Sequence, residues 1–179
     1  MTDEPRPELD PAGLLGVFAR HGVEFVAVGG FAALLHGAQR VTKDVDLCVR
    51  WSPENLERVA AALLELHARL KVDTYIEVPI DAVLLGRMEV ATWRTRSGDV
   101  DVLLGIPRDA RWELVRYEEL RGRGAVITIG ELEIPVAALE DIIRSKEIAD
   151  RPVDREALPE LRRLRDELEE ERGTQGPGD

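Results

Sequence analysis

Two acidic residues two positions apart, Asp44 and Asp46, are the strongest chemical signal in the 179-residue sequence. They stand at the start of a segment that alternates like a β-strand, in which residues two apart point to the same face. At ~5 Å and an effective dielectric constant of ~20, such carboxylates repel each other by about 3 kcal/mol. A divalent cation between them removes the repulsion, and Mg²⁺ prefers oxygen ligands while leaving positions for phosphate oxygens. The alternative is a pair of solvated acids at a strand end.

A third carboxylate on a later strand would complete this site. Asp99 and Asp101 both belong to the alternating segment near residues 100–104. Asp101 is flanked by valines and followed by two leucines, so solvation alone does not explain an acid there. Asp99 follows the Ser97-Gly98 turn and is interpreted as a turn residue. We therefore predict Asp44, Asp46 and Asp101 as the metal ligands.

A glycine pair, Gly29-Gly30, lies between a predicted strand, residues 24–28, and a short predicted helix, residues 31–36. Glycine lets backbone N–H groups approach an anion closely, and the helix would direct its positive end to the same place. Many strand-to-helix turns contain such a pair, so the signal is weak alone. Together with the acidic residues, it predicts a triphosphate site.

One lysine near the C-terminus falls on the apolar side of a predicted helix. Lys146 continues the helical stripe of Leu139, Ile142 and Ile143, and the chain has few lysines among its 24 Lys and Arg residues. Such a lysine either extends its ammonium to the rim of the core or points into a cleft, and we predict the cleft. Asp154 fits a functional role and a helix N-cap equally well.

The segment GGFAALLHGAQRVTKDVDL, residues 29–47, resembles the polymerase-β-type nucleotidyltransferase superfamily. In that family a Gly-Gly or Gly-Ser pair precedes a short helix and an Asp-x-Asp strand. The form here is most similar to minimal bacterial nucleotidyltransferases of the AbiEii and MenT toxin-like group. Residues 145–154 (SKEIADRPVD) resemble a segment near the end of those proteins, with Val153 where the family often has Lys.

The resemblance implies metal-dependent transfer of a nucleotidyl group, with pyrophosphate leaving. Two Mg²⁺ ions, or Mn²⁺ in their place, would bind the three predicted carboxylates, and Asp101 would also activate the acceptor hydroxyl. Lys146 would take part in catalysis and contact the triphosphate. The full set of expected nucleotide-binding residues is Gly29, Gly30, Arg40, Thr42, Lys146 and Asp154.

The acceptor implied by the toxin-like relatives is the 3′ end of tRNA, with a cognate antitoxin as partner. Three alternatives stay open: a protein acceptor, a small molecule such as an antibiotic, and a catalytically inactive nucleotide-binding module. Four arginines could line an acceptor groove, although an ordinary charged surface is the better explanation for any single one of them. They are Arg94, Arg96, Arg121 and Arg123.

The composition limits the class of protein. The formal net charge is −11, but most of this net charge comes from the two tails, so a basic face on the body and a nucleic-acid partner are not excluded. The N-terminus is acidic and no apolar run approaches the ~18 residues of a membrane span, which argues against a signal peptide and a membrane partner. A single cysteine, Cys48, suggests a reducing, cytoplasmic setting.

The helices and strands that must position these residues alternate in the first part of the chain, and several strands then follow one another. Helices are predicted over residues 14–19, 31–36, 53–66, 111–120, 136–149 and 157–171, and strands over 24–28, 45–50, 75–80, 89–95, 100–104, 125–129 and 132–134. The order predicts an α/β (α+β) nucleotidyltransferase fold with a mixed sheet. Residues 11–135 would form the core and 136–172 helices packed on it, between a disordered lead, 1–10, and tail, 173–179.

Overall fold

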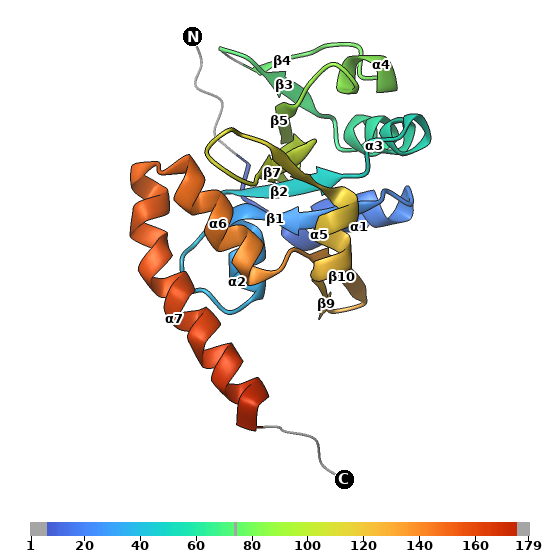
Figure 1. Ribbon diagram of the computed structural model, residues 1–179. Coiled ribbons are helices and arrows are strands. Elements are labelled where there is room, and N and C mark those ends of the chain that lie inside the picture. The colour runs from blue at the N-terminus through green and yellow to red at the C-terminus, as the bar shows by residue number, and fades with distance from the viewer. Residues whose placement is uncertain (1–6, 74, 175–179) are drawn as a thin grey trace.

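The computed structural model describes residues 7–73 and 75–174 and is built around a large β-sheet (Figure 1). The helices are α1 (Pro11–Arg20), α2 (Gly29–Leu35), α3 (Pro53–Glu65), α4 (Ala82–Leu85), α5 (Tyr117–Arg123), α6 (Leu139–Ala149) and α7 (Pro152–Thr174). The strands are β1 (Phe25–Val28), β2 (Asp44–Val49), β3 (Arg69–Lys71), β4 (Tyr75–Ile76), β5 (Val90–Thr95), β6 (Gly98–Leu103), β7 (Gly105–Pro107), β8 (Leu114–Arg116), β9 (Ala125–Ile129) and β10 (Leu132–Val136).

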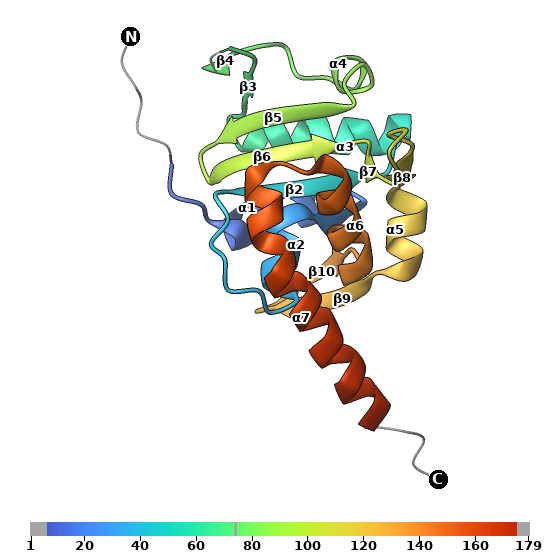
Figure 2. The same cartoon turned by 60° about the vertical axis from the view of Figure 1, so that its left-hand side comes forward.

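The main sheet has eight strands in the order β4-β3-β5-β6-β2-β1-β10-β9, and β7 and β8 form a separate pair. The neighbours β2 and β6 run parallel, as do β1 and β10, whereas the other pairs of the main sheet are antiparallel. In Figure 2 these strands follow one another from β4 and β3 at the top to β9 at the bottom. The predicted α/β fold with a mixed sheet is confirmed.

One face of the sheet is apolar and is covered by α1 and α3. Val45, Leu47 and Trp93 point to this side and are fully buried. Phe18 of α1 meets Phe25 of β1 edge to face, with ring centroids 6.4 Å apart. This packing explains why apolar and polar residues alternate along the strands, because every second side chain points away from the acidic face and into the core.

The helices α2, α6 and α7 lie against the opposite face. Helix α6 contacts α2 and α7, and α7 runs past them until its C-terminal part extends beyond the body (Figure 2). Leu158 and Leu161 of α7 are buried, and Leu164 and Leu168 pack partly against the core. The leucine stripe therefore attaches α7 to the body.

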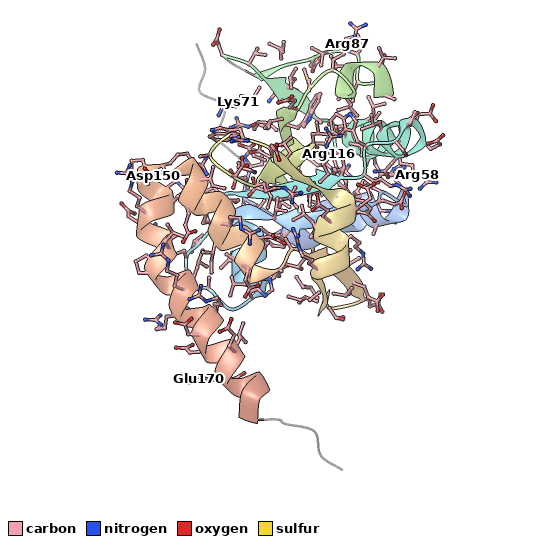
Figure 3. All side chains as sticks on the ribbon, in the orientation of Figure 1. Arg58, Lys71, Arg87, Arg116, Asp150 and Glu170 are labelled. Carbon is pink, nitrogen blue, oxygen red and sulfur yellow. The ribbon has the colours of Figure 1, made fainter. Side chains whose placement is uncertain are left out.

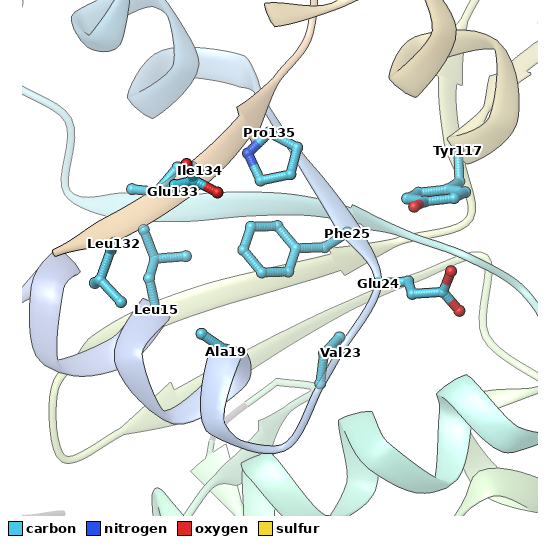
Figure 4. A pocket seen from close by; sticks show the side chains of 10 residues that line it. All are labelled: Leu15, Ala19, Val23, Glu24, Phe25, Tyr117, Leu132, Glu133, Ile134 and Pro135. Carbon is cyan, nitrogen blue, oxygen red and sulfur yellow. The ribbon is translucent and has the colours of Figure 1, made fainter. Parts of the chain in front are cut away.

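A small apolar hollow of about 240 Å³ lies between α1, β1, β10 and α5. Figure 4 shows the ring of Phe25 in its centre, with Leu15 and Ile134 on one side and Tyr117 on the other. Two carboxylates, Glu24 and Glu133, are among the residues that line it, and none of the predicted site residues is. The hollow belongs to the core packing of α1.

Three predicted elements are wrong. The predicted helix 111–120 is instead strand β8 followed by α5, because Leu114 and Val115 pair with β7, a contact that local periodicity does not encode. The strand predicted over 75–80 is limited to β4, and β3 and α4 were not predicted. Helix α7 begins at Pro152 and continues through Pro159, which the prediction had placed near the helix start.

The predicted disordered ends fall partly outside the described residues. Residues 1–6 and 175–179 lie outside them, as does residue 74 within the segment predicted around β4. Within the described part, Leu9 packs against the core, Asp10 accepts a hydrogen bond from the backbone N–H of Gly13 at 2.9 Å, and α7 continues to Thr174. Of the helices in this part of the chain, none is both long and apolar enough to cross a membrane.

Candidate active site

Four carboxylates share one face of the neighbouring strands β2 and β6. Their parallel register places Asp44 beside Asp99 and Asp46 beside Asp101. Residues paired in this way point to the same side of a sheet. This side borders a cleft of about 770 Å³, which is lined by Asp44, Asp46 and Asp101. The three predicted metal ligands therefore face a common cleft.

Asp99 and Asp101 have different surroundings, although they lie two residues apart. Asp99 is only 5% exposed, and its Oδ1 accepts a hydrogen bond from Nε of Arg94 at 3.3 Å. Asp101 lines the cleft, and its Oδ1 atom is buried without a hydrogen-bond partner. Since a buried polar atom without a partner is costly, Asp101 is the carboxylate of this pair that lines the cleft and keeps an unused acceptor.

The cluster shifts the protonation of its members. Burial, followed by the negative charges of Asp101 and Asp44, raises the pKa of Asp46 to about 7. Burial also raises the pKa of Asp101, although a hydrogen bond from the Thr92 hydroxyl and the charge of Lys71 act in the opposite direction. These directions are those expected of carboxylates held together without a cation between them.

The glycine pair forms the first turn of α2 and not, as predicted, a turn before it. Gly29 has a φ of +64°, and a Cβ atom at this position would lie 2.1 Å from Oδ2 of Asp46. The backbone N–H of Gly30 donates a hydrogen bond to the Asp46 carboxylate. Glycine is thus required here because the backbone passes directly against the central carboxylate.

The loop between α2 and β2 closes over the same turn. The Thr42 hydroxyl donates to Oδ1 and to the carbonyl oxygen of Asp44, each at 3.1 Å. Arg40 lines the cleft and forms an ion pair with Glu156 of α7, whose atoms are 3.1 Å apart. Thr42 therefore positions a cleft carboxylate, and Arg40 links the loop to α7.

Lys146 lies on the wall formed by α6 and α7. Its Nζ atom is 3.0 Å from Oδ1 of Asp154, and its charge reaches Asp46 strongly enough to oppose the rise in that pKa. Asp154 is fully buried and also accepts from Nε of Arg151 at 2.6 Å. Burial alone would raise the pKa of Asp154, but the hydrogen bonds from Arg151 and Lys146 hold it below its usual value.

Asp154 is not a helix N-cap residue, which was one of the two roles predicted for it. It lies in the first turn of α7, and its Oδ2 accepts from the backbone N–H of Arg151 at 3.3 Å. It does line the cleft, but its oxygens are occupied by Lys146 and Arg151. The side chain therefore holds a lysine in place at the cleft wall.

Sequence reasoning missed Thr92 and Lys71, which both act on Asp101, and it overrated four arginines. Thr92 pairs with Asp101 across β5 and β6, a register that follows from the tight turn between Thr95 and Gly98. Among the described residues, the lining of the cleft includes none of Arg94, Arg96, Arg121 and Arg123, and Arg123 pairs with Asp141 at 2.9 Å. Counting back from the turn would have found Thr92.

The residues fit a divalent cation in chemical type. All candidate ligands are carboxylate oxygens, which Mg²⁺ and Mn²⁺ prefer, and Asp101 offers an unsatisfied acceptor. Within residues 7–73 and 75–174, no three His, Cys, Asp or Glu side chains are already arranged around a single ion position. For an ion to bind all three, the side chains of Asp44, Asp46 and Asp101 would have to turn towards one position.

Comparison with solved structures identifies the fold. No family model and no curated protein sequence matches the chain. The crystal structure of ANT(2″)-Ia in complex with adenylyl-2″-tobramycin is 18% identical, with 87% of this chain and 85% of that chain covered and a TM-score of 0.53. At this identity the likeness concerns the fold alone: the chain has the nucleotidyltransferase fold.

Two further structures have TM-scores of 0.49. The solution structure of the same antibiotic-resistance factor is 16% identical and covers 84% of this chain and 77% of that chain. A Thermotoga maritima protein named as a nucleotidyltransferase is 15% identical, with 92% of this chain and 97% of that chain covered.

Proposed function

We propose that this protein is a metal-dependent nucleotidyltransferase, which moves a nucleoside monophosphate from a nucleoside triphosphate to an acceptor hydroxyl. The proposal depends on one observation above all. Asp44, Asp46 and Asp101 share one face of adjacent strands in a cleft whose opposite wall holds Lys146. A fold of the same kind could have lost any of these groups, so their joint presence favours an active enzyme over an inactive nucleotide-binding module.

The carboxylates would hold two Mg²⁺ or Mn²⁺ ions. When bound, the metal neutralises charge on the triphosphate and lowers the pKa of the attacking hydroxyl. The raised pKa of Asp46, about 7, follows from burial and from the charges of Asp101 and Asp44. A cation relieves that repulsion, which is the electrostatic reason for assigning the ions to these three residues.

The other residues of the cleft bind and orient the reactants. The acceptor oxygen attacks the α-phosphorus, the bond to the leaving oxygen of pyrophosphate breaks, and the hydroxyl proton passes to Oδ1 of Asp101. That oxygen is a buried acceptor without a partner. Lys146 supplies positive charge for the leaving phosphates, and its buried partner Asp154 keeps it in place.

The remaining nucleotide contacts follow from the lining of the cleft. Gly29 and Gly30 allow the phosphates to approach Asp46, whereas Thr42 orients Asp44 by its hydrogen bond. Arg40 lines the cleft from the loop, where a triphosphate would bind, and it also pairs with Glu156.

For the acceptor we propose the 3′ end of tRNA, with the protein acting in the cytoplasm as the toxin of a toxin-antitoxin pair. This assignment comes from the resemblance of residues 29–47 to the AbiEii and MenT group. The alternative is a small molecule, since the ANT(2″)-Ia structure contains adenylyl-2″-tobramycin. The two acceptors differ in charge, so a direct assay separates them.

The test is incubation of the protein with each of the four radiolabelled nucleoside triphosphates, Mg²⁺, and either total RNA or tobramycin. We expect label in the tRNA band, loss of label with Asp46→Asn, and full activity with Asp166→Asn, which changes an exposed aspartate on α7. Expression in bacteria should arrest growth for the wild type and not for Asp46→Asn. Label on tobramycin alone would reject the RNA acceptor, and no label on any acceptor would reject the enzyme.

A further inference from the structure

The cleft has a charged part and an apolar end. Its charged lining residues come from the loop before β2, from β2 itself, from Asp101 and from the wall of α6 and α7. In contrast, the described lining residues at position 90 and at positions 103–112 carry no charge. They are Val90, Leu103, Gly105, Ile106, Pro107 and Trp112, and we call them the apolar end of the cleft.

The register of the strands places the apolar end beside the carboxylates. Leu103 of β6 pairs with Val90 of β5. Leu103 follows Asp101 by two residues, so the two side chains share a face and are ~7 Å apart along the strand. The chain continues into β7, which contacts β2 and α6, and Figure 2 shows β7 and β8 where β6 ends. Because β2 and β6 run parallel, the loop with Arg40 lies at the start of these strands and the apolar end lies at their finish.

Trp112, in the loop between β7 and β8, is the aromatic residue of the apolar end. It is 59% exposed, so burial in the core does not account for it. Its φ of +61° is one that large side chains rarely adopt. The loop holds this conformation, because the backbone N–H of Trp112 donates to the carbonyl oxygen of Asp109 at 3.0 Å. Such a strained position, kept by an exposed aromatic residue, indicates a role in binding.

Exposed apolar side chains gather around the cleft. Val41, Val90, Trp112 and Val153 are all large hydrophobic residues that are more than half exposed, and all four line it. Their contact with water is unfavourable. A ligand with an apolar surface would cover them, whereas a ligand made only of phosphates would not.

The two parts of the cleft fit the two parts of a nucleotide. The proposed metal ions and phosphates belong with the carboxylates, the glycine turn and Lys146. A nucleobase is joined to the α-phosphate through one sugar, and its flat faces stack on aromatic side chains. A polycationic amino sugar suits the apolar end poorly, because the described residues of that end include no carboxylate to pair with its ammonium groups.

We propose that Trp112 stacks on the base of the nucleoside triphosphate, with Leu103 and Val90 as the floor of the same subsite. This inference rests on the proposed function, which it deepens by naming the residue that holds the base. Stacking uses ring faces that all bases possess. The larger purines should therefore bind more tightly than the pyrimidines, and ATP and GTP should differ little.

The test is isothermal titration calorimetry in Mg²⁺ with ATP, GTP, CTP, UTP and inorganic tripolyphosphate, which has no base. Trp112→Ala should weaken the binding of ATP and GTP roughly tenfold, the scale of one base stacked on an aromatic ring. Trp112→Phe should retain most of the affinity. Tripolyphosphate should bind equally to the wild type and to both variants, which also shows that the variants are folded.

Tryptophan fluorescence gives a second measurement with a matched control. Stacking of ATP on Trp112 should quench part of the emission, and Trp112→Phe should abolish this change. The control is Trp51→Phe, because Trp51 is half-buried and is not among the residues that line the cleft. This variant should keep both the quenching and the affinity of the wild type.

Label transfer separates this inference from the proposed function. If Trp112→Ala binds ATP like the wild type while an acceptor is still labelled, the inference is overturned and the function stands. A higher KM for the acceptor with unchanged ATP affinity would place the ring under the acceptor and also overturn it, as would an equal loss of tripolyphosphate binding. If ATP binding depends on Trp112 but no acceptor is labelled, the proposed activity fails and the base subsite stands.

Discussion

Asp46→Asn should stabilise the metal-free protein at neutral and alkaline pH, although it removes a central residue of the site. The pKa of Asp46 is raised from 3.8 to about 7, first by burial and then by the charges of Asp101 and Asp44. One unit of pKa corresponds to about 1.4 kcal/mol. Holding this carboxylate ionised in the folded protein therefore costs up to about 4 kcal/mol, which the neutral amide avoids.

The sign of the pH dependence follows from the two pKa values. Between pH 3.8 and about 7 the folded protein holds a proton on Asp46 that the unfolded chain has released. The free energy of unfolding then falls as the pH rises through this interval. The full penalty is present above pH 7 and absent below pH 3.8, so the advantage of the variant should grow across the same interval.

The measurement is thermal unfolding, followed by circular dichroism in the presence of a chelator. For a chain of 179 residues, 1 kcal/mol shifts Tm by roughly 2–4 °C, so the variant should melt on the order of 10 °C higher at pH 8. The amide oxygen can still accept the hydrogen bond from Gly30. Added Mg²⁺ should raise Tm of the wild type and narrow the difference.

Two results would refute this reasoning. Equal Tm values at pH 8 in chelator would mean that the carboxylates do not strain the folded protein. A larger advantage of the variant at pH 4 than at pH 8 would mean that its effect is one of packing. Asp166→Asn, at an exposed position, should show neither the gain nor its pH dependence.

Three further predictions concern single residues of the cleft. Gly29→Ala should destabilise the protein strongly and abolish transfer. The control is Gly22→Ala, because Gly22 has a similar φ of +66° but open space around its Cβ position. In urea unfolding, this control should lower the free energy of unfolding by only about 1–2 kcal/mol, the cost of backbone strain. Asp101→Asn should abolish transfer at saturating substrate, but Asp99→Asn should keep measurable kcat, and equal losses would contradict their separate roles. Lys146→Met leaves a buried carboxylate short of one partner and should lower the free energy of unfolding by about 3 kcal/mol, and an unchanged urea midpoint would count against that pairing.

Local patterns in the sequence predicted the parts of the fold in which burial alternates along a single element. Val45 and Leu47 are fully buried, and their neighbours Asp44 and Asp46 face the cleft, so the strand could be read from its own residues. The segment around Leu114 could not, because its conformation depends on pairing with β7. Long-range pairing leaves no periodic trace in so short a strand.

Asp154 illustrates why the site was only partly predictable. Its position before a run of helical residues suggested a cap, but its function in the structure depends on Lys146, eight residues earlier on another helix. The apolar stripe of α6 led to the prediction that Lys146 points into a cleft, and Lys146 does line the cleft. What it could not reveal was that a fully buried carboxylate would hold the ammonium there, since that requires the packing of α7 against α6.

The two walls of the cleft follow different physical rules, and this difference links the fold to the proposed chemistry. On the α6 and α7 wall, each cation is matched by a buried or nearby acid, so the positive charge is fixed in position and locally balanced. On the other wall, Asp44, Asp46 and Asp101 bring negative charge together on the adjacent strands β2 and β6. A lysine held in place by a buried acid suits a small ligand that binds in one pose, whereas clustered carboxylates suit a divalent cation that joins them to phosphate oxygens. The affinity for nucleoside triphosphate should therefore fall in Lys146→Met, and in the wild type it should change little with salt, because a largely buried ion pair is weakly screened.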